Sequence, residues 1–111
     1  MTADEFREIA LGLPEVIEHK HMNHPDFRVN GKVFATLGYP DGKWAMVKLS
    51  QEEQEVFVSA SSDAFAPVKG AWGRQGCTNV RLDASDVAAA KRAIASPWSN
   101  IATKPRTKKV R

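Results

Sequence analysis

Apolar residues near the start of the chain repeat every three or four positions, a spacing typical of a helix that buries one face. Thr2 and Glu5 have the spacing of a capping box, in which each side chain satisfies a free backbone N–H of the first helical turn. Gly12 and Pro14 then interrupt the pattern. The chain is therefore predicted to open with a helix that ends at Gly12.

Two further helices are predicted by the same rules. Ser50 and Glu53 form a second capping box and open a helix that continues as far as residue 61. Asp83 or Ser85 caps a last helix, and a separate short turn with Pro97 in its first position follows. The apolar stripe of the last helix consists of Val87, Ala90 and Ile94, and the extra turn carries Trp98 and Ile101.

Alternating apolar and polar residues between these helices predict strands joined by hairpins. Asn30-Gly31 lies between 27–29 and 32–37, and this dipeptide accepts the positive φ angles of a type I′ turn. A second hairpin leads through 38–42 into a strand over 43–49. The first half of the chain thus contains three strands in sequence.

The rest of the pattern completes the predicted architecture. A short extended piece near Phe65 and a strand over 77–82 follow the middle helix, and residues 15–25 form an irregular or extended segment. The order is α-β-β-β-α-β-β-α. Sequential hairpins favour a two-layer α+β domain in which an antiparallel sheet of about five strands carries helices on one face. The absence of a βαβ unit with a glycine fingerprint argues against a dinucleotide-binding fold.

The hairpin turns also predict which residues share a face of the sheet. With Phe27 opposite Phe34 and Leu37 opposite Lys43, one face is aromatic and the other is aliphatic. A register slip of one residue would reverse this assignment. The aromatic face carries Phe27, Val29, Phe34, Trp44 and Met46 with Lys32 and Lys48 at one end, and the aliphatic face carries Val33, Ala35, Leu37, Ala45 and Val47.

Two alternatives follow, because the helices of a two-layer fold cover one face of the sheet. Helices over the aromatic face leave the aliphatic face partly exposed or shared in a homodimer. Helices over the aliphatic face leave an aromatic and lysine surface that suits base stacking and phosphate contacts. The exposure of Phe34 and Trp44 distinguishes the two alternatives.

Length and composition are those of one globular domain. The 111 residues suffice for one hydrophobic core, and 42% of them are hydrophobic against 26% charged. We expect a single domain over 1–103 and a disordered basic tail over 104–111. The chain has no apolar run that spans a membrane, no basic-then-apolar secretion signal and one cysteine, Cys77, so the cytoplasm is its expected location.

Charge is distributed unevenly between the domain and the tail. Residues 1–103 hold 11 basic and 13 acidic residues, a net charge of −2, whereas 104–111 hold five basic residues and no acidic one. Together the two parts give the formal net charge of +3. The high isoelectric point therefore belongs to the tail, which suits either a solubility role or a weak, salt-sensitive attraction to nucleic acid.

Several blocks of the sequence resemble the MmcQ/YjbR family of small bacterial proteins. The most specific block is His-Pro-Asp-Phe-Arg-Val-Asn-Gly-Lys-Val-Phe-Ala over 24–35, and 13–15, 44–49, 72–76 and 96–98 support it. The resemblance extends over residues 1–103. The chain departs from the family at Cys77, where an aromatic residue usually follows the glycine, so no contact of that aromatic is carried over.

This resemblance carries expectations about fold and function. It implies a two-layer fold like that of type III secretion chaperones. It also implies DNA binding, a label that rests on a likeness in shape to double-wing DNA-binding modules. Because one fold hosts many functions, the binding assignment depends on which residues form the site.

The glycine-rich segment 69–76 is the first candidate site. Its glycines permit close approach of a ligand to the backbone, Lys69 and Arg74 suit phosphate, and Trp72 suits stacking. The alternative is a flexible wing whose Trp72 folds onto the core. The segment lacks the helix pair of a KH loop and the Gly-Lys-Ser/Thr of a Walker loop.

Metal and catalytic sites find less support in the sequence. His19, His21 and His24 lie within six residues, with Asp26 as the carboxylate closest to them. The cluster lacks cysteine and a complete ligand set. Cys77 has no histidine near it in sequence, and the glutamates at 52, 53 and 55 suit a helix start. We therefore expect no metal, no cofactor and no enzymatic activity.

The sequence as a whole favours a small binding module. Nucleic acid, with DNA as the leading form, is the expected partner, contacted by the basic tail and the loop tips. The alternative is a protein-interaction or chaperone-like adaptor, including a homodimeric one, that uses a sheet face or a helix groove. The candidate contact residues for nucleic acid are Arg28, Lys32, Lys43, Lys48, Lys69, Trp72, Arg74, Lys104, Arg106, Lys108, Lys109 and Arg111.

Overall fold

The computed structural model of the chain describes residues 1–21, 23–38 and 41–103. The predicted basic tail over 104–111 and the tip of the second hairpin at 39–40 lie outside the described residues. The described part forms one antiparallel sheet in the order β1-β2-β3-β4-β6-β5. The six strands are β1 (Ile17–His21), β2 (His24–Val29), β3 (Lys32–Leu37), β4 (Trp44–Lys48), β5 (Phe65–Pro67) and β6 (Cys77–Arg81).

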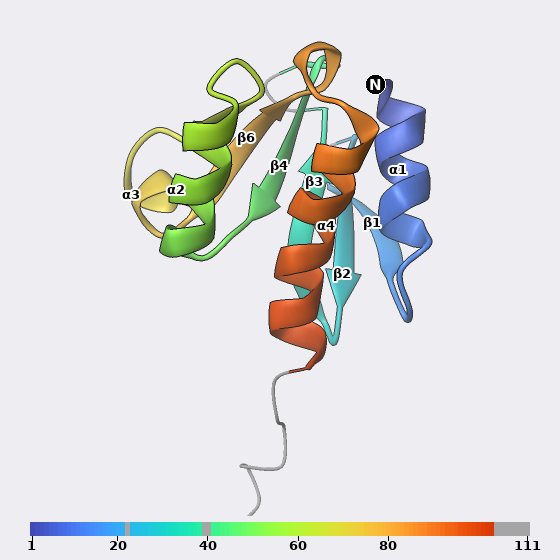
Figure 1. The fold of residues 1–111 in the computed structure, drawn as a ribbon. Coiled ribbons are helices and arrows are strands. Elements are labelled where there is room, and N and C mark those ends of the chain that lie inside the picture. Colours follow the sequence, from blue (N-terminus) through green and yellow to red (C-terminus); the bar gives the residue numbers. More distant parts are fainter. Residues whose placement is uncertain (22, 39–40, 104–111) are drawn as a thin grey trace, which may run out of the picture.

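Helices α1, α2 and α4 lie on one face of this sheet (Figure 1). The short α3 belongs to the connection from β5 to β6. The predicted two-layer α+β fold is confirmed, with one strand more than expected. The helices are α1 (Ala3–Leu11), α2 (Gln51–Ala60), α3 (Ala71–Arg74) and α4 (Val87–Ala102), with a 3-10 turn over Leu82–Ala84. Among the residues described, no helix combines the length and apolar character needed to cross a bilayer.

Both predicted capping boxes are present. Thr2 Oγ1 accepts from the N–H of Glu5 at 3.1 Å, and the Glu5 carboxylate accepts from the N–H of Thr2 at 2.8 Å. Ser50 and Glu53 form the same reciprocal pair at the start of α2, with distances of 3.1 and 2.9 Å. Each pair satisfies two backbone donors that the first turn leaves free, which explains why the helices begin at these residues.

The last helix differs from its prediction at two points. Its cap is Asp86, whose Oδ1 accepts from a backbone N–H of the first turn at 2.7 Å, and neither Asp83 nor Ser85. The helix also continues through Pro97, so the separate second turn is wrong. Pro97 lacks one helical hydrogen bond. Packing offsets this loss, because Pro97 is buried and Trp98 packs against the core.

Strand β1 was not predicted by the sequence. It pairs along β2 from Ile17 opposite Arg28 to His21 opposite His24. Its sequence, Ile-Glu-His-Lys-His, has no apolar alternation. An edge strand forms from backbone hydrogen bonds to a single neighbour and needs no buried side-chain row of its own. The segment over 15–25, predicted to be irregular or extended, is therefore extended in its central part, where it forms a strand.

A β-bulge in the first hairpin decides which residues face the helices. The Asn30-Gly31 turn has φ angles of 54° and 77°, as a type I′ turn requires. Further along the hairpin the register shifts, so Phe27 lies opposite Ala35 and not opposite Phe34. One extra residue on β3 therefore reverses which side chains face the helices, both in the rest of β3 and in β4.

Because of the bulge, both predicted versions of the sheet faces are wrong. The second hairpin pairs Leu37 with Ala45 rather than with Lys43, but this shift of two positions leaves the faces unchanged. Phe34 is fully buried, whereas Trp44 is half-buried on the other side. The core combines Phe27, Val29 and Phe34 of the predicted aromatic face with Ala35, Leu37, Ala45 and Val47 of the predicted aliphatic face.

The helices close this core from above. Phe6 and Ala10 of α1 and Ile94 of α4 are fully buried against the sheet, together with Ala90. Val87, predicted as part of the same stripe, is 42% exposed. Helices within the chain bury Ala35, Leu37, Ala45 and Val47, so these residues of the predicted aliphatic face do not form an exposed surface.

Candidate functional site

The face of the sheet opposite the helices is best defined along β4 and β6. Ala45 and Val47 are buried beneath the helices, so the residues between and beside them point to the opposite face. Cross-strand pairs place these residues of the two strands side by side. We define the β4–β6 surface as Trp44, Met46, Lys48, Asn79 and Arg81, together with Trp72, which lies beside Lys48.

Two cation–aromatic pairs mark the two ends of this surface. The Nζ atom of Lys48 lies 5.8 Å from the ring centre of Trp72. At the other end, the guanidinium carbon of Arg81 lies 6.0 Å from the ring centre of Trp44. Both distances lie within the range of cation–π attraction, which contributes about 0.5–1 kcal/mol at exposed sites. The surface therefore offers aromatic rings that already carry positive charge beside them.

Two glycines build the turn that presents Trp72. A Cβ atom on Gly73 would overlap the carbonyl oxygen of Val68, and a Cβ atom on Gly76 would overlap that of Leu49. Gly76 also has a φ of 111°, which side chains rarely permit. The sequence predicted that these glycines allow a ligand to approach the backbone. In the structure, Gly73 and Gly76 instead allow the chain to pack closely against its own backbone.

Side-chain amides of α2 hold the same turn in place. Gln51 donates to the carbonyl of Arg74 at 2.6 Å. Gln54 donates to the carbonyl of Gly73 at 3.0 Å and also contacts Thr78. Trp72 is 62% exposed, so the prediction of a flexible wing with this side chain on the core is wrong. Instead, α3 holds Trp72 outward at the edge of the β4–β6 surface.

Cys77 lies opposite Lys48 and is buried. Burial raises the pKa of the Cys77 thiol, against a smaller lowering by the charge of Lys48. A thiol with a raised pKa carries little thiolate at neutral pH and is a poor nucleophile. Cys77 therefore acts as a small, buried apolar residue beside Lys48.

Arg28 of β2 forms an ion pair with Asp26. Its guanidinium donates to both carboxylate oxygens of Asp26, at 3.0 and 3.3 Å. The hydrogen bond to Asp26 raises the pKa of Arg28, and the carboxylate is 7% exposed. This ion pair neutralises most of the charge that Arg28 would otherwise present to a ligand.

The other predicted contact residues of the described chain lie at the ends of elements. Lys32 is the first residue of β3, directly after the hairpin turn, and Lys43 directly precedes β4 near the Trp44 end. Lys69 precedes α3 and Arg74 is its last residue, both at the Trp72 end, and all four side chains are exposed. The remaining predicted contacts, Lys104, Arg106, Lys108, Lys109 and Arg111, lie outside the described residues.

Charge separates between the helical layer and the rest of the described chain. α1, α2 and α4 carry twice as many acidic as basic residues, whereas the rest of the described chain, which includes Arg74 of α3, carries slightly more basic than acidic residues. A polyanion is therefore repelled by the helical layer and meets least repulsion at the sheet. The charged residues of these helices are Asp4, Glu5, Glu8, Glu52, Glu53 and Glu55 against Arg7, Lys91 and Arg92.

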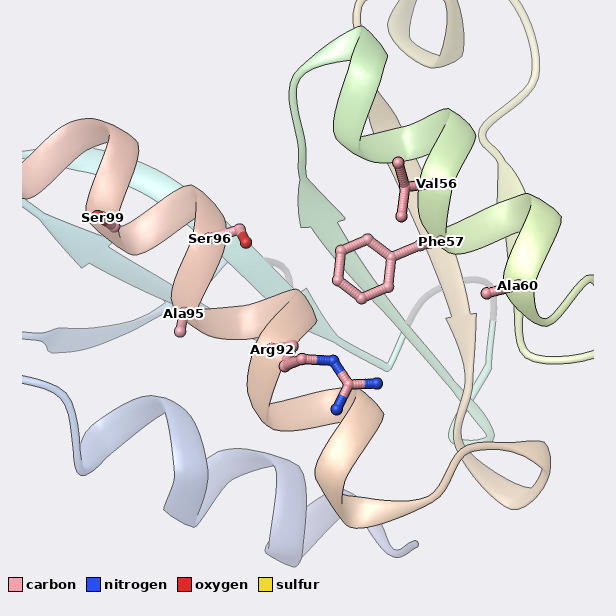
Figure 2. Close-up of a pocket in the computed structure, with 7 residues that line it drawn as sticks. All are labelled: Val56, Phe57, Ala60, Arg92, Ala95, Ser96 and Ser99. Carbon is pink, nitrogen blue, oxygen red and sulfur yellow. The ribbon is translucent and has the colours of Figure 1, made fainter.

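A second surface lies between α2 and α4, on the helical side (Figure 2). It is a groove of about 480 Å³ into which the Phe57 ring points, and Val56 on its wall is 66% exposed. α2 has no fully buried residue, so its apolar side is only partly covered. The groove is lined by Val56, Phe57, Ala60, Arg92, Ala95, Ser96 and Ser99.

The two ends of this groove differ in charge. At one end, Asn100 of α4 donates to Glu53 of α2 at 3.1 Å, and Glu52 lies one turn before Val56 on the same side of the helix. At the other end, Arg92 has no ion-pair partner among the described residues. The groove is thus apolar along its length, acidic at one end and basic at the other.

The three histidines lie on the first two strands of the sheet. His19 and His21 lie in β1 and His24 lies in β2, and the side chain of His21 is not among those that the structure describes. Within residues 1–21, 23–38 and 41–103 no group of three His, Cys, Asp or Glu residues has a metal-binding arrangement. A Cβ atom on Gly38 would lie 3.1 Å from Nδ1 of His24, so this ring lies beside the glycine that follows β3.

Comparison with known proteins assigns the chain by its sequence. The family model described as YjbR matches residues 11–99. The chain belongs to the YjbR family. Among solved structures, this YjbR-family chain is similar to the Deinococcus radiodurans protein DR2400, which is described as carrying the domain DUF419. The TM-score is 0.75 and the sequence identity is 16%, and the match covers 97% of this chain and 86% of that one. This likeness supports the shared fold alone. No curated protein sequence matches the chain.

Sequence reasoning missed Arg81 and Asn79 as members of the site. A signal for them exists in the alternation of β6, where Thr78 and Val80 are buried and the residues on either side are polar or small. Their place beside Trp44 and Met46 depends on the pairing of β6 with β4, which joins segments more than 30 residues apart. Local pattern contains no information on that pairing.

Proposed function

We propose that this YjbR-family chain binds nucleic acid through the β4–β6 surface. The observation that supports the proposal is the pairing of Lys48 with Trp72 and of Arg81 with Trp44 on one sheet face. Aromatic rings stack on bases, and adjacent cations contact phosphates. The acidic helical layer on the opposite side orients a polyanion toward the sheet.

Basic residues outside this surface supply attraction without sequence preference. Lys69 and Arg74 lie at the Trp72 end, and the five cations of 104–111 follow α4 in the sequence. Each phosphate contact releases counterions, so the affinity falls as salt rises. The family's DNA-binding label agrees with this proposal, and the residues named here supply a physical reason for it.

Reversing the charge of Lys48 tests the proposal. For Lys48→Glu we expect roughly five- to tenfold weaker binding of a fluorescein-labelled 20-nucleotide DNA at low salt, because a phosphate contact is replaced by repulsion. The wild-type affinity is expected to fall steeply between 50 and 200 mM salt, on the order of tenfold or more. Fluorescence anisotropy at the two salt concentrations measures both effects.

Lys91→Glu is the matched control, because Lys91 is exposed on α4 and its reversal changes the net charge equally. It is expected to lower the affinity by less than about twofold, since the helical layer faces away from the ligand. Equal losses for the two variants would show that net charge alone matters. The absence of salt-dependent binding at about 100 µM protein would reject nucleic acid as the ligand.

A second candidate function is supported by the groove between α2 and α4. We propose that it docks an amphipathic helix of another protein, as an adaptor would. The exposed Val56 and the inward Phe57 ring offer apolar contact, and the free Arg92 suits a carboxylate on the docked helix. Glu52 at the opposite end suits a basic residue, so the two charges set the direction of the helix.

A random library of displayed helical peptides tests this docking. We expect selected peptides to share an apolar i, i+3/i+4, i+7 stripe and one acidic end, and to bind Val56→Asp and Arg92→Glu at least about tenfold more weakly. Both residues are exposed, so neither substitution is expected to unfold the protein, and circular dichroism checks this. Selected peptides that bind both variants as tightly as the wild type would reject the groove as their site.

A further inference from the structure

The two indoles of the β4–β6 surface, the exposed Trp72 and the half-buried Trp44, are set apart along the strand. Trp44 and Lys48 are the first and last residues of β4, so their Cα atoms are about 14 Å apart at about 3.4 Å per residue. The Trp72 ring lies beside Lys48 and is 62% exposed. The surface therefore has one aromatic platform at each end and Met46 with Asn79 between them.

A base stacks on such a platform only when it is unpaired or splayed from its neighbours. In a duplex, both faces of each base are covered by the adjacent base pairs, and a protein reaches base edges through the grooves. Reading a groove requires an element that projects into it. The helices α1, α2 and α4 of the described chain lie on the opposite face, and α3 has four residues.

The charges on this face also argue against duplex binding. Arg28 is paired with Asp26 at 3.0 Å, and Arg81 is paired with Asp83 at 2.9 Å. Lys48 has no acidic partner in the described ranges. The face thus neutralises few phosphates, whereas duplex binding depends strongly on phosphate neutralisation.

We infer that the β4–β6 surface takes single-stranded nucleic acid, with unpaired bases stacked on Trp44 and Trp72. This inference rests on the proposed function and specifies its ligand. A stacked strand rises about 3.4 Å per nucleotide, so about four steps match the length of β4 from Trp44 to Lys48, beside which Trp72 lies. The site therefore accommodates about five nucleotides, within the range of other single-strand-binding surfaces.

Three oligonucleotides of equal length test the inference against the full chain. They are a 12-nucleotide mixed-sequence single strand, its blunt-ended duplex, and an abasic 12-mer that keeps the phosphates and sugars. We expect the single strand to bind at least about tenfold more tightly than either of the others, since stacking supplies the difference. Single strands of three to twelve nucleotides are expected to gain affinity steeply up to about five nucleotides and slowly beyond that length.

Trp72→Leu is expected to weaken single-strand binding about tenfold and to leave the abasic affinity unchanged. Trp72→Phe keeps a π face and is expected to restore most of the loss. Val87→Ser, an exposed apolar change at the start of α4 on the helical side, serves as the control and is expected to alter neither affinity.

The outcomes separate this inference from the proposed function. Equal binding of single strand, duplex and abasic strand would overturn the stacking of bases, while nucleic-acid binding would stand. Salt-dependent binding that Trp72→Leu and Trp44→Leu both leave intact would also overturn it. If none of the three oligonucleotides binds, the proposed function fails, and the inference fails with it.

Discussion

Replacing Val47 with aspartate is expected to lower the free energy of unfolding by about 4 kcal/mol or more. Val47 is fully buried beneath the helices, so a carboxylate there has no water and no cationic partner. Small domains are stable by roughly 5–15 kcal/mol, so this variant should unfold at much lower urea concentration. Urea titration followed by circular dichroism measures the change.

Met46→Asp is the matched control for this substitution. It introduces the same charge at the adjacent position of β4, but Met46 lies on the side of the sheet away from the helices and is half-buried. We expect a loss of about 1 kcal/mol. Without the bulge the two residues would exchange faces, so a larger loss for Met46→Asp than for Val47→Asp would contradict the register described here.

Replacing Gly76 with alanine is expected to destabilise the protein by about 3 kcal/mol or more. Its φ of 111° strains any side chain, and the new Cβ atom would overlap the backbone of Leu49. Gly76 also accepts hydrogen bonds from Leu49 N–H at 3.2 Å and Thr78 Oγ1 at 2.8 Å. The substitution is therefore also expected to disturb the structure of the turn that presents Trp72.

Gly42→Ala provides the comparison for this glycine. Nothing lies within 4 Å of a Cβ atom at Gly42, and its φ is outside the positive region. We expect a change within about 0.5 kcal/mol. Thermal unfolding of both variants, with Trp72 exposure read by acrylamide quenching, tests the pair. Similar stability of the two variants would show that the α3 turn does not pack on β4 as described.

The candidate site was only partly predictable from sequence, and the reasons differ between residues. Lys48 and Trp72 were named from their chemistry, since a lysine in a strand and a tryptophan among glycines both suit nucleic acid. Their contact at 5.8 Å depends on the packing of α3 against β4 and β6. Arg81 was missed because its neighbour Trp44 belongs to a distant part of the chain.

The α2–α4 groove illustrates the same limit. Phe57 and Ala95 lie on helices that the sequence predicted well, but their apposition depends on how both helices rest on the sheet. Helix periodicity identifies an apolar side and does not identify what covers it. The free Arg92 at the groove end is likewise visible only once the neighbouring charges are placed.

By itself, the sequence determined the features that depend on short stretches of chain. The two capping boxes set the starts of α1 and α2, and Asn30-Gly31 set the first hairpin turn. Each of these relies on hydrogen bonds or φ angles within a few residues, so the local residue types suffice. The two-layer α+β class followed from the order of these elements.

Only the tertiary structure decided which side chains face the ligand side. The bulge opposite Phe27 reverses the alternation in β3 and β4, so Val47 is buried and Trp44 lies on the side away from the helices. The energy that favours the bulge comes from packing Phe34 and the aliphatic residues together under α1 and α4. Because this packing energy comes from residues that lie far apart in the chain, no local sequence pattern indicates it.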